Sequence, residues 1–455
     1  MGASLKAPQS MVGKTLVITL RDSHLNAALH EDQFVRTTLY DGSPFDPPLP
    51  SAFQSRSITA IKIELDQLSN TGAQLATLRL AGSLLDLYPS ADCQIQISGS
   101  IGIELQHCIR FVGLDYRAID NAIVLTRPRC EASQKGLVSV LIAAHNPRYL
   151  IEALQSVERQ SYRAIEVIVC DDCPTDEVEK LVLAHARAGT LPLRYFRNAT
   201  KLGVRRNYER CFENATGEFA KFLNDDDRLE PTCIEKMVAA LNAYPTAQLV
   251  SAHRRRIDER GHPIRDQPAT TPIVGRDTYI EGTSLINALL LLGLNFVGEP
   301  SSAMFRVASG RVGIEPLIHF LDSMARGVAD MVLWCKLALR GDCICLAERL
   351  TEFRIHAEQR TQATGVSTLA LTAIPELREH WSRLGFIEHF PPNVLRTIDL
   401  ATLDFKLPTN ARSVTESWGA RALPLFAPTD QSESELIANW KAKRHPYFES
   451  QTKTV

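Results

Sequence analysis

The chain has 455 residues, of which 45% are hydrophobic and 22% are charged, a composition typical of ordinary globular proteins. This length predicts about three domains. The formal net charge is −2, from 50 Lys and Arg against 52 Asp and Glu, so no whole-chain field attracts nucleic acid. We therefore expect no nucleic-acid partner.

Hydrophobic runs are too short for a membrane span, which needs about 18–20 apolar residues. The longest candidate, residues 285–297, is interrupted by Asn287 and Asn295. The first 14 residues lack the apolar core of a signal peptide, and the ten scattered cysteines are interpreted as reduced thiols. These features predict a cytoplasmic protein without a transmembrane segment.

Residues 1–135 are predicted to form a β-rich accessory domain. Apolar and polar residues alternate over residues 61–65, and odd-numbered apolar residues recur from 95 to 105. This period is typical of strands with one buried face. Turn dipeptides such as Asp41-Gly42 and Ser98-Gly99 favour an antiparallel sheet or sandwich. The polar segment 131–136 is interpreted as a linker.

Strands and helices alternate in the next part of the chain. Strands are expected over residues 138–144, 165–170, 191–196 and 218–223, with helices near 150–157, 204–215 and 234–241. Such alternation predicts βαβ crossovers and a mainly parallel sheet. Ligands of these sheets bind at the carboxyl ends of the strands.

Polar and acidic residues follow three of these strands. Residues 143–146 end in His145 and Asn146, residues 171 and 172 are both Asp, and residues 224–227 read Asn-Asp-Asp-Asp. Carboxylates gathered in one crevice are costly without a cation, and Mg²⁺ is commonly held by one or two carboxylates plus substrate phosphates. The sequence thus predicts a Mn²⁺ or Mg²⁺ site. Any single Asp here is equally understandable as a turn residue or helix cap.

Six segments in order resemble the inverting family 2 glycosyltransferases. They are residues 138–146, 166–176, 203–207, 215–227, 329–341 and 353–356, and the resemblance extends over residues 136–362. It implies the GT-A fold, an α/β nucleotide-binding αβα sandwich with a mainly parallel sheet. Residues 363–455 would then be a mixed C-terminal extension.

The resemblance also implies roles for individual residues. Asp330 would be the general base, Asp226 the metal ligand, and His356 a second metal or pyrophosphate ligand. Residues near the nucleotide and donor sugar would be Ala143, His145, Asp171, Asp172, Arg206, Asp225 and Asp227.

The implied reaction moves a sugar from a nucleotide-sugar donor to the hydroxyl of a carbohydrate or glycolipid acceptor. One displacement, with Asp330 taking the acceptor proton, inverts the anomeric carbon. By family analogy the product is a surface polysaccharide or glycoconjugate. We expect the loop Gly298–Ser301 and the C-terminal part to help bind the acceptor. Peripheral attachment to the inner face of the membrane and homo-oligomer formation stay open.

Departures from the family pattern motivate an alternative, a degenerate nucleotide- or glycan-binding module. Ala329 stands where the family has Glu, and Asn224 where it has Asp. A nucleotidyltransferase is disfavoured because no Gly-rich basic loop follows the first strand.

Three further patterns have structural interpretations. Asp330 alone would also suit a helix N-cap. The Cys170–Cys173 pair lacks the second ligand pair of a zinc site. The run Arg254-Arg255-Arg256 is interpreted as a solvated strand edge.

Overall fold

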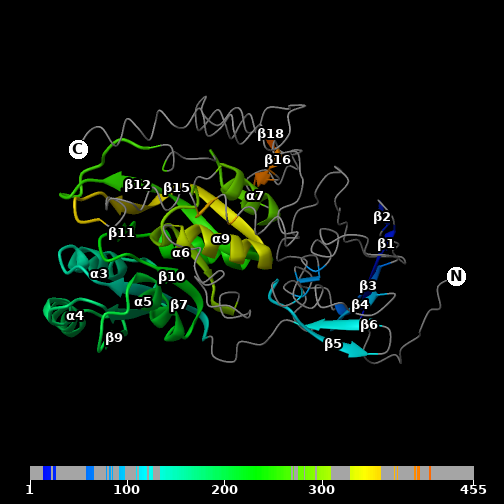
Figure 1. Ribbon diagram of the computed structural model, residues 1–455, viewed down its shortest axis with the longest axis horizontal. Coiled ribbons are helices and arrows are strands. Elements are labelled where there is room, and N and C mark those ends of the chain that lie inside the picture. Colours follow the sequence, from blue (N-terminus) through cyan, green and yellow to red (C-terminus); the bar gives the residue numbers. More distant parts are fainter. Residues whose placement is uncertain are drawn as a thin grey trace. The chain divides into compact units, whose positions relative to one another are not determined.

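The computed structural model describes residues 134–267, 275–280, 282–292, 295–308 and 328–359, together with shorter pieces of the rest (Figure 1). The larger of these pieces are residues 14–21, 58–65, 92–97, 112–119 and 122–126. Contacts divide the chain into two units, one made mainly of residues 1–129 and the other mainly of residues 130–455.

The first unit contains a six-stranded sheet in the order β2-β1-β3-β4-β6-β5. Its strands are β1 Lys14–Arg21, β2 His24–Asn26, β3 Ile58–Leu65, β4 Asp92–Ile97, β5 Asp115–Ile119 and β6 Ala122–Thr126. The strand expected at residues 61–65 is therefore present, and β4 covers the start of the 95–105 pattern. Residues 98–105 and the turn at Asp41-Gly42 lie outside the described residues.

The expected antiparallel arrangement of this unit is wrong in part. Strand β3 pairs in parallel with both β1 and β4, whereas β6 pairs antiparallel with β4 and β5. Parallel neighbours need a long crossover rather than a tight turn. The 36 and 26 residues that separate β3 from β1 and β4 supply such lengths (58 − 21 − 1 and 92 − 65 − 1). Alternation within a strand carries no information on its neighbour's direction.

The second unit is built on a ten-stranded sheet in the order β17-β13-β15-β12-β14-β10-β7-β8-β9, with β11 paired to β15. Strands β10, β7, β8 and β9 are parallel neighbours, as are β12 and β15, while β14 runs antiparallel between β10 and β12. The prediction of a mainly parallel α/β sheet is confirmed. The strands are β7 Gln134–Ala144, β8 Ile165–Asp171, β9 Leu193–Arg197, β10 Gly217–Phe222, β11 Arg228–Leu229, β12 Ala247–Ile257, β13 Thr278–Ile280, β14 Ala303–Arg306, β15 Asp342–Arg354 and β17 Thr397–Asp399. A separate pair joins β16 Val394–Leu395 to β18 Thr409–Asn410.

Helices flank this sheet (Figure 1). They are α3 Leu150–Glu158, α4 Glu177–Ala188, α5 Val204–Glu213, α6 Cys233–Ala243, α7 Gly282–Leu292 and α9 Ala329–Arg340, with a 3₁₀ turn η2 Pro300–Ser302. Every residue of α9 from Met331 to Arg340 is buried, so α9 is a core helix. Within the described residues no helix is both long and apolar enough to cross a membrane.

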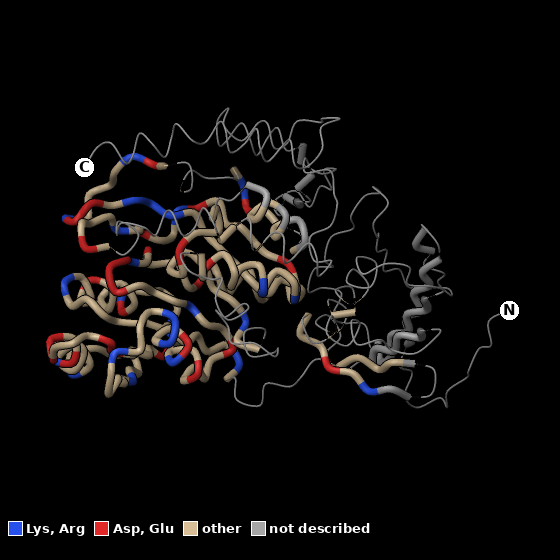
Figure 2. Tube along the Cα trace, in the orientation of Figure 1, with Lys and Arg blue, Asp and Glu red and all other residues tan. Residues whose placement is uncertain are grey.

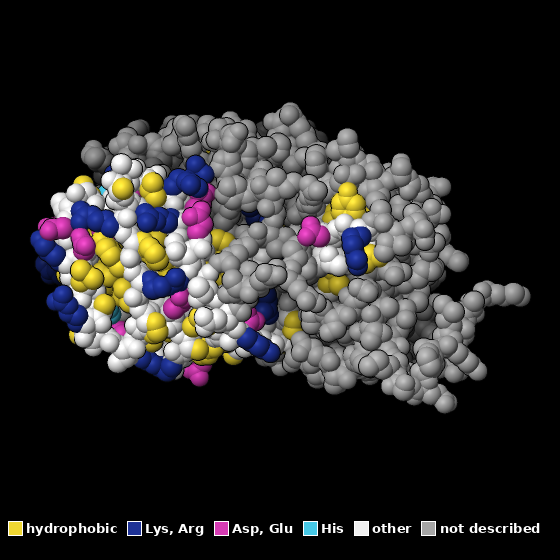
Figure 3. Space-filling view, turned by 90° about the horizontal axis from the view of Figure 1, so that it is seen from below, with side chains coloured by type: hydrophobic (Ala, Val, Ile, Leu, Met, Phe, Trp, Pro, Cys, Tyr) yellow, Lys and Arg dark blue, Asp and Glu magenta, His cyan; other side chains and the backbone are white. Residues whose placement is uncertain are grey.

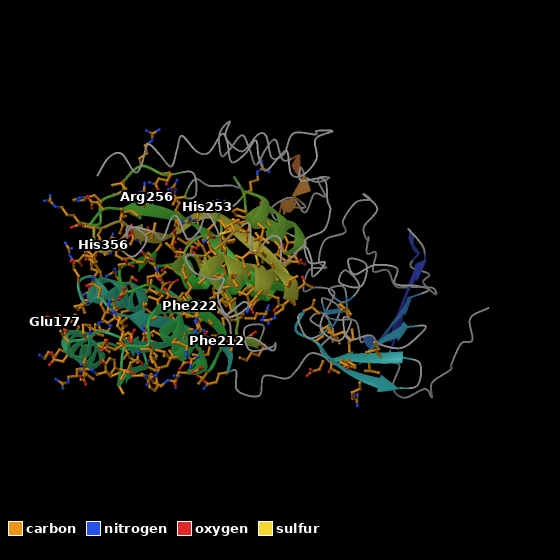
Figure 4. All side chains as sticks on the ribbon, viewed as in Figure 1. Glu177, Phe212, Phe222, His253, Arg256 and His356 are labelled. Atoms are coloured by element: carbon orange, nitrogen blue, oxygen red, sulfur yellow. The ribbon has the colours of Figure 1, made fainter. Side chains whose placement is uncertain are left out.

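Aromatic packing joins α5 to the sheet. The Phe212 ring lies 5.8 Å from Phe305, and Phe305 lies 6.0 Å from Phe222 on β10 (Figure 4). The run from Val138 to Ile142 in β7 is inaccessible to solvent, as expected for a strand covered on both faces.

Two predicted boundaries need correction. Strand β7 begins at Gln134, inside the predicted linker 131–136, because Gln134 donates its N–H to the carbonyl of Thr216 beside it. Strand β9 begins at Leu193, two residues late, because Pro192 has no N–H to give to the sheet.

Candidate active site

The segment after β10 is fixed to the end of β7 by Asp225. Its Oδ2 accepts the backbone N–H of His145 at 2.7 Å and that of Asn146 at 2.8 Å. Burial, and next the charge of Asp226, raise the pKa of Asp225 to about 6. The structure thus brings together two of the strand ends that the sequence singled out.

Asp226 lies beside His356, which follows β15. The His356 Nε2 atom is 3.0 Å from Asp226 Oδ2, and the two side chains are 3% and 16% exposed. The His356 ring also meets the edge of Tyr149, at the start of α3, with centroids 5.2 Å apart (Figure 4). Residues 130 positions apart in sequence are therefore joined by one side-chain contact.

Arg354 is a buried residue that holds this arrangement together, and sequence reasoning assigned it no role. Its side chain is 0% exposed, and its Nε donates to the backbone oxygen of Asp226 at 2.9 Å. Its Nη2 reaches Glu152 at 2.6 Å, and the guanidinium lies 4.3 Å from the centroid of Tyr149. The signal was available, because Arg354 is the first residue of the Arg-x-His motif.

Asp227, expected near the donor sugar, faces protein rather than solvent. Its side chain is 0% exposed. Oδ2 accepts from Ser301 Oγ at 2.6 Å and Asn224 Nδ2 at 2.9 Å, and Oδ1 accepts the N–H of Arg354 at 3.0 Å. Burial, and then the charge of Asp226, hold its pKa well above the usual range. Asp227 thus joins three chain segments.

The end of β8 is organised around Asp172. Its Oδ1 accepts from Asn198 at 2.9 Å and from the N–H of Leu202 at 2.7 Å, and Oδ2 accepts the N–H of Gly203 at 2.8 Å. Burial opposes ionisation, but these donors outweigh it and lower the pKa of Asp172. The neighbouring Asp171 is 1% exposed and accepts from the hydroxyl of Tyr195 at 2.6 Å. Both carboxylates therefore shape the loops at this edge.

Three other predicted residues surround these strand ends. Ala143 is half-buried near the end of β7, and exposed His145 has Nδ1 3.1 Å from the carbonyl of Asp172. Arg206 is 54% exposed on α5 and pairs with buried Glu209 at 2.7 Å. The helix itself is tied to the same edge, since Asn207 donates to the carbonyl of Cys170 at 2.9 Å.

Asp330 is the second residue of α9 and does not cap it. The N-cap position is Val328, which makes no side-chain cap hydrogen bond. Asp330 Oδ2 accepts from Asn295 Nδ2 at 2.7 Å, and Oδ1 accepts the N–H of Met331 at 2.8 Å. Burial is the main cause, and Glu299 a further one, of a pKa raised to about 6. A carboxyl group with this pKa is a usable proton acceptor at neutral pH.

Residues 295–302, here called the bridge loop, connect Asp330 with the acidic segment. Asn295 at one end binds Asp330, and Ser301 at the other binds Asp227 and accepts the N–H of Asn224 at 2.9 Å. Lys221, buried on β10, donates to the carbonyl of Ser301. The sequence drew attention to residues 298–301 for acceptor binding but did not predict this connection.

The basic run on β12 is not the solvated edge that was expected. Arg254 and Arg256 are 3% and 9% exposed. Arg254 Nε lies 2.5 Å from Glu299 Oε2 of the bridge loop, and Arg255 pairs with Glu230 at 2.9 Å. A strand alternates its side chains between faces, and both faces of β12 are covered here. The cysteines of the CxxC pattern are free thiols.

Comparison with known proteins identifies the domain that carries this site. A family model described as glycosyl transferase family 2 matches residues 139–310. Residues 139–310 belong to glycosyltransferase family 2.

Individual relatives of the glycosyltransferase domain are distant. The uncharacterized protein MT1568 of Mycobacterium tuberculosis is 28% identical over 240 residues, which cover 49% of this chain and 68% of that one. The GalNAc(5)-diNAcBac-PP-undecaprenol beta-1,3-glucosyltransferase of Campylobacter jejuni is 31% identical over 107 residues, or 23% of this chain and 34% of that enzyme. Among solved structures, TarS 1–349 of S. aureus in complex with UDP-GlcNAc is similar over 68% of this chain and 73% of that one, with 15% identity and a TM-score of 0.40. This chain thus spans about two thirds of the first relative and a third of the second.

Two side chains at the edge of the sheet, Asp226 and His356, could contribute to a metal site. Among the described residues no group of three or more His, Cys, Asp or Glu side chains is arranged to hold a metal. Asp226 Oδ2 and His356 Nε2 are 3.0 Å apart and contact each other directly. They are the residues that would hold a Mn²⁺ or Mg²⁺ ion, together with the diphosphate of a substrate.

Proposed function

We propose that the chain is a metal-dependent inverting glycosyltransferase that moves a sugar from a nucleotide-sugar donor to an acceptor hydroxyl. The observation that carries the proposal is the meeting of Asp226 and His356 at the edge where Asp225 joins β10 to β7. A pair of ligand atoms at the carboxyl ends of parallel strands is where a diphosphate and its cation would bind.

The nucleotide is assigned to the ends of β7 and β8. Ala143 and His145 would line it, with Asp171 and Asp172 holding the surrounding loops through the hydrogen bonds described above. Arg206 would reach the phosphates from α5, because its side chain is more than half exposed. Asp225 would lie near the ribose, while buried Asp227 holds the segment through Ser301 and Arg354.

A Mn²⁺ or Mg²⁺ ion at Asp226 and His356 would, when bound, offset negative charge that develops on the departing diphosphate. Asp330 would accept the proton of the acceptor hydroxyl as its oxygen attacks the anomeric carbon. Attack from the face opposite the leaving group inverts that carbon, and no covalent intermediate on the protein is needed.

The acceptor class is a carbohydrate or glycolipid, in the synthesis of a surface polysaccharide or glycoconjugate. The name of the C. jejuni relative, a glucosyltransferase of an undecaprenol-linked glycan, supports this class. Acidic and basic residues are mixed along the described part of the chain, which does not suit a nucleic acid partner (Figure 2).

A cytoplasmic location at the inner face of the membrane is part of the proposal. The described cysteines are free thiols, as in a reducing compartment. Leu202 and Val204 are 39% and 44% exposed beside Lys201 and Arg205. Figure 3 shows one face of the described domain on which basic side chains lie among hydrophobic ones. Binding to phosphatidylglycerol vesicles but not phosphatidylcholine vesicles, and its loss in Leu202→Ser/Val204→Ser, would support the location.

A thermal-shift screen of nucleoside diphosphates, with and without Mn²⁺, tests the function. A ligand that binds only the native state raises the melting temperature. At 100 times its Kd it adds about 2.7 kcal/mol to the free energy of unfolding. We expect a shift that needs both Mn²⁺ and one nucleotide and is absent in Asp226→Asn. No shift with any nucleotide would refute the proposal. Nucleotide binding without hydrolysis or transfer of any donor would instead favour the degenerate binding module, which Ala329 and Asn224 motivate.

A further inference from the structure

A second carboxylate lies beside Asp330, on the bridge loop. Glu299 is 22% exposed, and its charge acts on both Asp330 and Asp227. In the loop it follows Asn295, which binds Asp330, and precedes Ser301, which binds Asp227.

The position of Glu299 is fixed by a buried cation. Arg254, 3% exposed, places Nε 2.5 Å from Glu299 Oε2 and donates Nη2 to the carbonyl of Asn295 at 3.2 Å. Asn295 and Gly298 exchange two hydrogen bonds at 2.9 and 3.0 Å, and Trp334 Nε1 donates to the Gly298 carbonyl at 2.9 Å. A loop tied at this many points presents Glu299 in one place.

Asn295 fixes the plane of the Asp330 carboxylate. Its Oδ1 is taken by the N–H of Gly298, so its Nδ2 is directed to Asp330 Oδ2 at 2.7 Å. The NH₂ group of an Asn can only donate, so the carboxylate accepts this hydrogen bond. This bond favours the ionised form of Asp330, whereas the charge of Glu299 opposes it.

Ionisable groups also lie on some of the elements packed on α9. Helix α7 has no ionisable side chain. On β12, Arg254 pairs with Glu299. On β15, Asp342 lies beyond the far end of α9 and binds Gly282 N at 2.8 Å. Of these charges, Glu299 raises the pKa of Asp330, and Arg254 is the ion-pair partner of Glu299.

We propose that Asn295 and the Glu299–Arg254 pair are positioning residues for Asp330, the first orienting its carboxylate and the second setting the charge beside it. This inference rests on the proposed function. The acceptor proton passes to Asp330, and neither Asn295 nor Glu299 exchanges protons with substrate. The bridge loop thereby supplies the acidic neighbour that Ala329 cannot provide.

The pH dependence of transfer separates this role from a purely structural one. The acid limb of kcat/KM should follow the pKa of Asp330, near 6. Glu299→Gln removes a like charge and should move the limb to lower pH by about 0.5–1 unit. Asn295→Ala removes a donor to the ionised form and should move it to higher pH. Glu299→Asp keeps the charge and should leave the limb in place.

Opposite shifts in the two variants would support the inference. The inference would be overturned if the acid limb of kcat/KM is unshifted in both variants or shifts in the same direction in both. Loss of packing alone would not shift the two limbs in opposite directions. Glu348→Gln, which removes an exposed carboxylate paired with Lys236, is the matched control and should change nothing. If Glu299→Gln does not fold, Asn295→Ala and Glu299→Asp still test the inference. The acid limb should move to higher pH in the first and stay in place in the second.

A second readout does not need activity. Asp330 has a raised folded pKa, so its contribution to stability is present below its ordinary pKa and is lost as pH rises through about 6. The pH-dependent difference in Tm between the full chain and Asp330→Asn measures that loss, and it should occur at lower pH in the Glu299→Gln background. An unchanged profile would overturn the inference even if transfer occurs. If no transfer occurs, the proposed function fails, and the Tm profile still tests the contact.

Discussion

Two sides of the candidate active site differ in how they are built. On the nucleotide side, the groups that meet follow directly after β7, β8 and β10, and parallel strands bring their ends to one edge. On the acceptor side, Asp330 is placed by the bridge loop, whose partners lie 35 to 80 residues away in sequence. One side follows from strand order, and the other depends on long-range hydrogen bonds.

The largest expected effect is on activity, and nucleotide binding tells the two sides of the site apart. Asp330→Asn should lower kcat by about 10²–10⁴-fold, because it removes the proposed general base. Asp330→Asn should keep the Mn²⁺-dependent shift in Tm that a nucleotide causes. Asp226→Asn should lose both this shift and the transfer activity. Steady-state kinetics and thermal shift measure the two effects. Full activity in either variant would break the division.

Arg354→Met should be the most destabilising change near the acidic segment. It removes a fully buried cation from Glu152 and from the backbone of Asp226. Loss of one partner from a buried charge network costs about 3–5 kcal/mol. Urea denaturation measures the loss, with Arg255→Met, on a 36% exposed side chain, as the comparison. Equal losses in the two variants would contradict the role given to Arg354.

Lys221 links the two sides, because it lies on β10 and donates to the carbonyl of Ser301 in the bridge loop. Its burial predicts that stability depends on pH. Burial lowers its pKa to about 8, against an ordinary 10.5. The unfolded chain then binds more protons between these values, so this group adds stability as pH rises from about 8 to 10.5, by about 3 kcal/mol in all.

Lys221→Met should remove this gain. The measurement is the difference in Tm between the two proteins across that range, because burial also raises the pKa of Cys233 to about 11. A constant difference would show that Lys221 titrates normally.

A pair of glycines gives the smallest effect and the closest comparison between the sides. Gly203 and Gly298 both have positive φ, +79° and +106°. A Cβ at Gly298 would lie 2.7 Å from Arg254 Nη1 and closer still to Ser302 Oγ, whereas one at Gly203 meets nothing within 4 Å. Backbone strain costs about 1–3 kcal/mol at each, and Gly298→Ala adds a steric clash. Chemical denaturation should therefore find Gly298→Ala the less stable. If Gly203→Ala is instead the less stable variant, the bridge loop accommodates a Cβ at residue 298 by a small backbone shift.

Much of the nucleotide side was predictable from the sequence. The apolar runs at residues 138–144 and 165–170 correspond to β7 and β8, and Asp225 and Asp226 lie at the predicted edge. Such runs identify buried strands because only parallel strands covered on both faces are apolar throughout. Burial was harder to predict. Arg254 was expected to be solvated, and the burial of Asp227 was not predicted, because sequence alone does not say which charges find partners inside the protein.

By itself the sequence determined the local chemistry: which strands form, which residues end them, and which motif residues are present. Tertiary structure decided which carboxylates are enclosed by other protein groups and which could take part in the proposed chemistry. Asp227 is enclosed by Ser301, Asn224 and Arg354, while Asp226 meets His356 and Asp330 meets Asn295. The physical reason is that a hydrogen bond or ion pair depends on distance in space, and a residue's spacing along the chain sets that distance only within one element or between neighbouring strands.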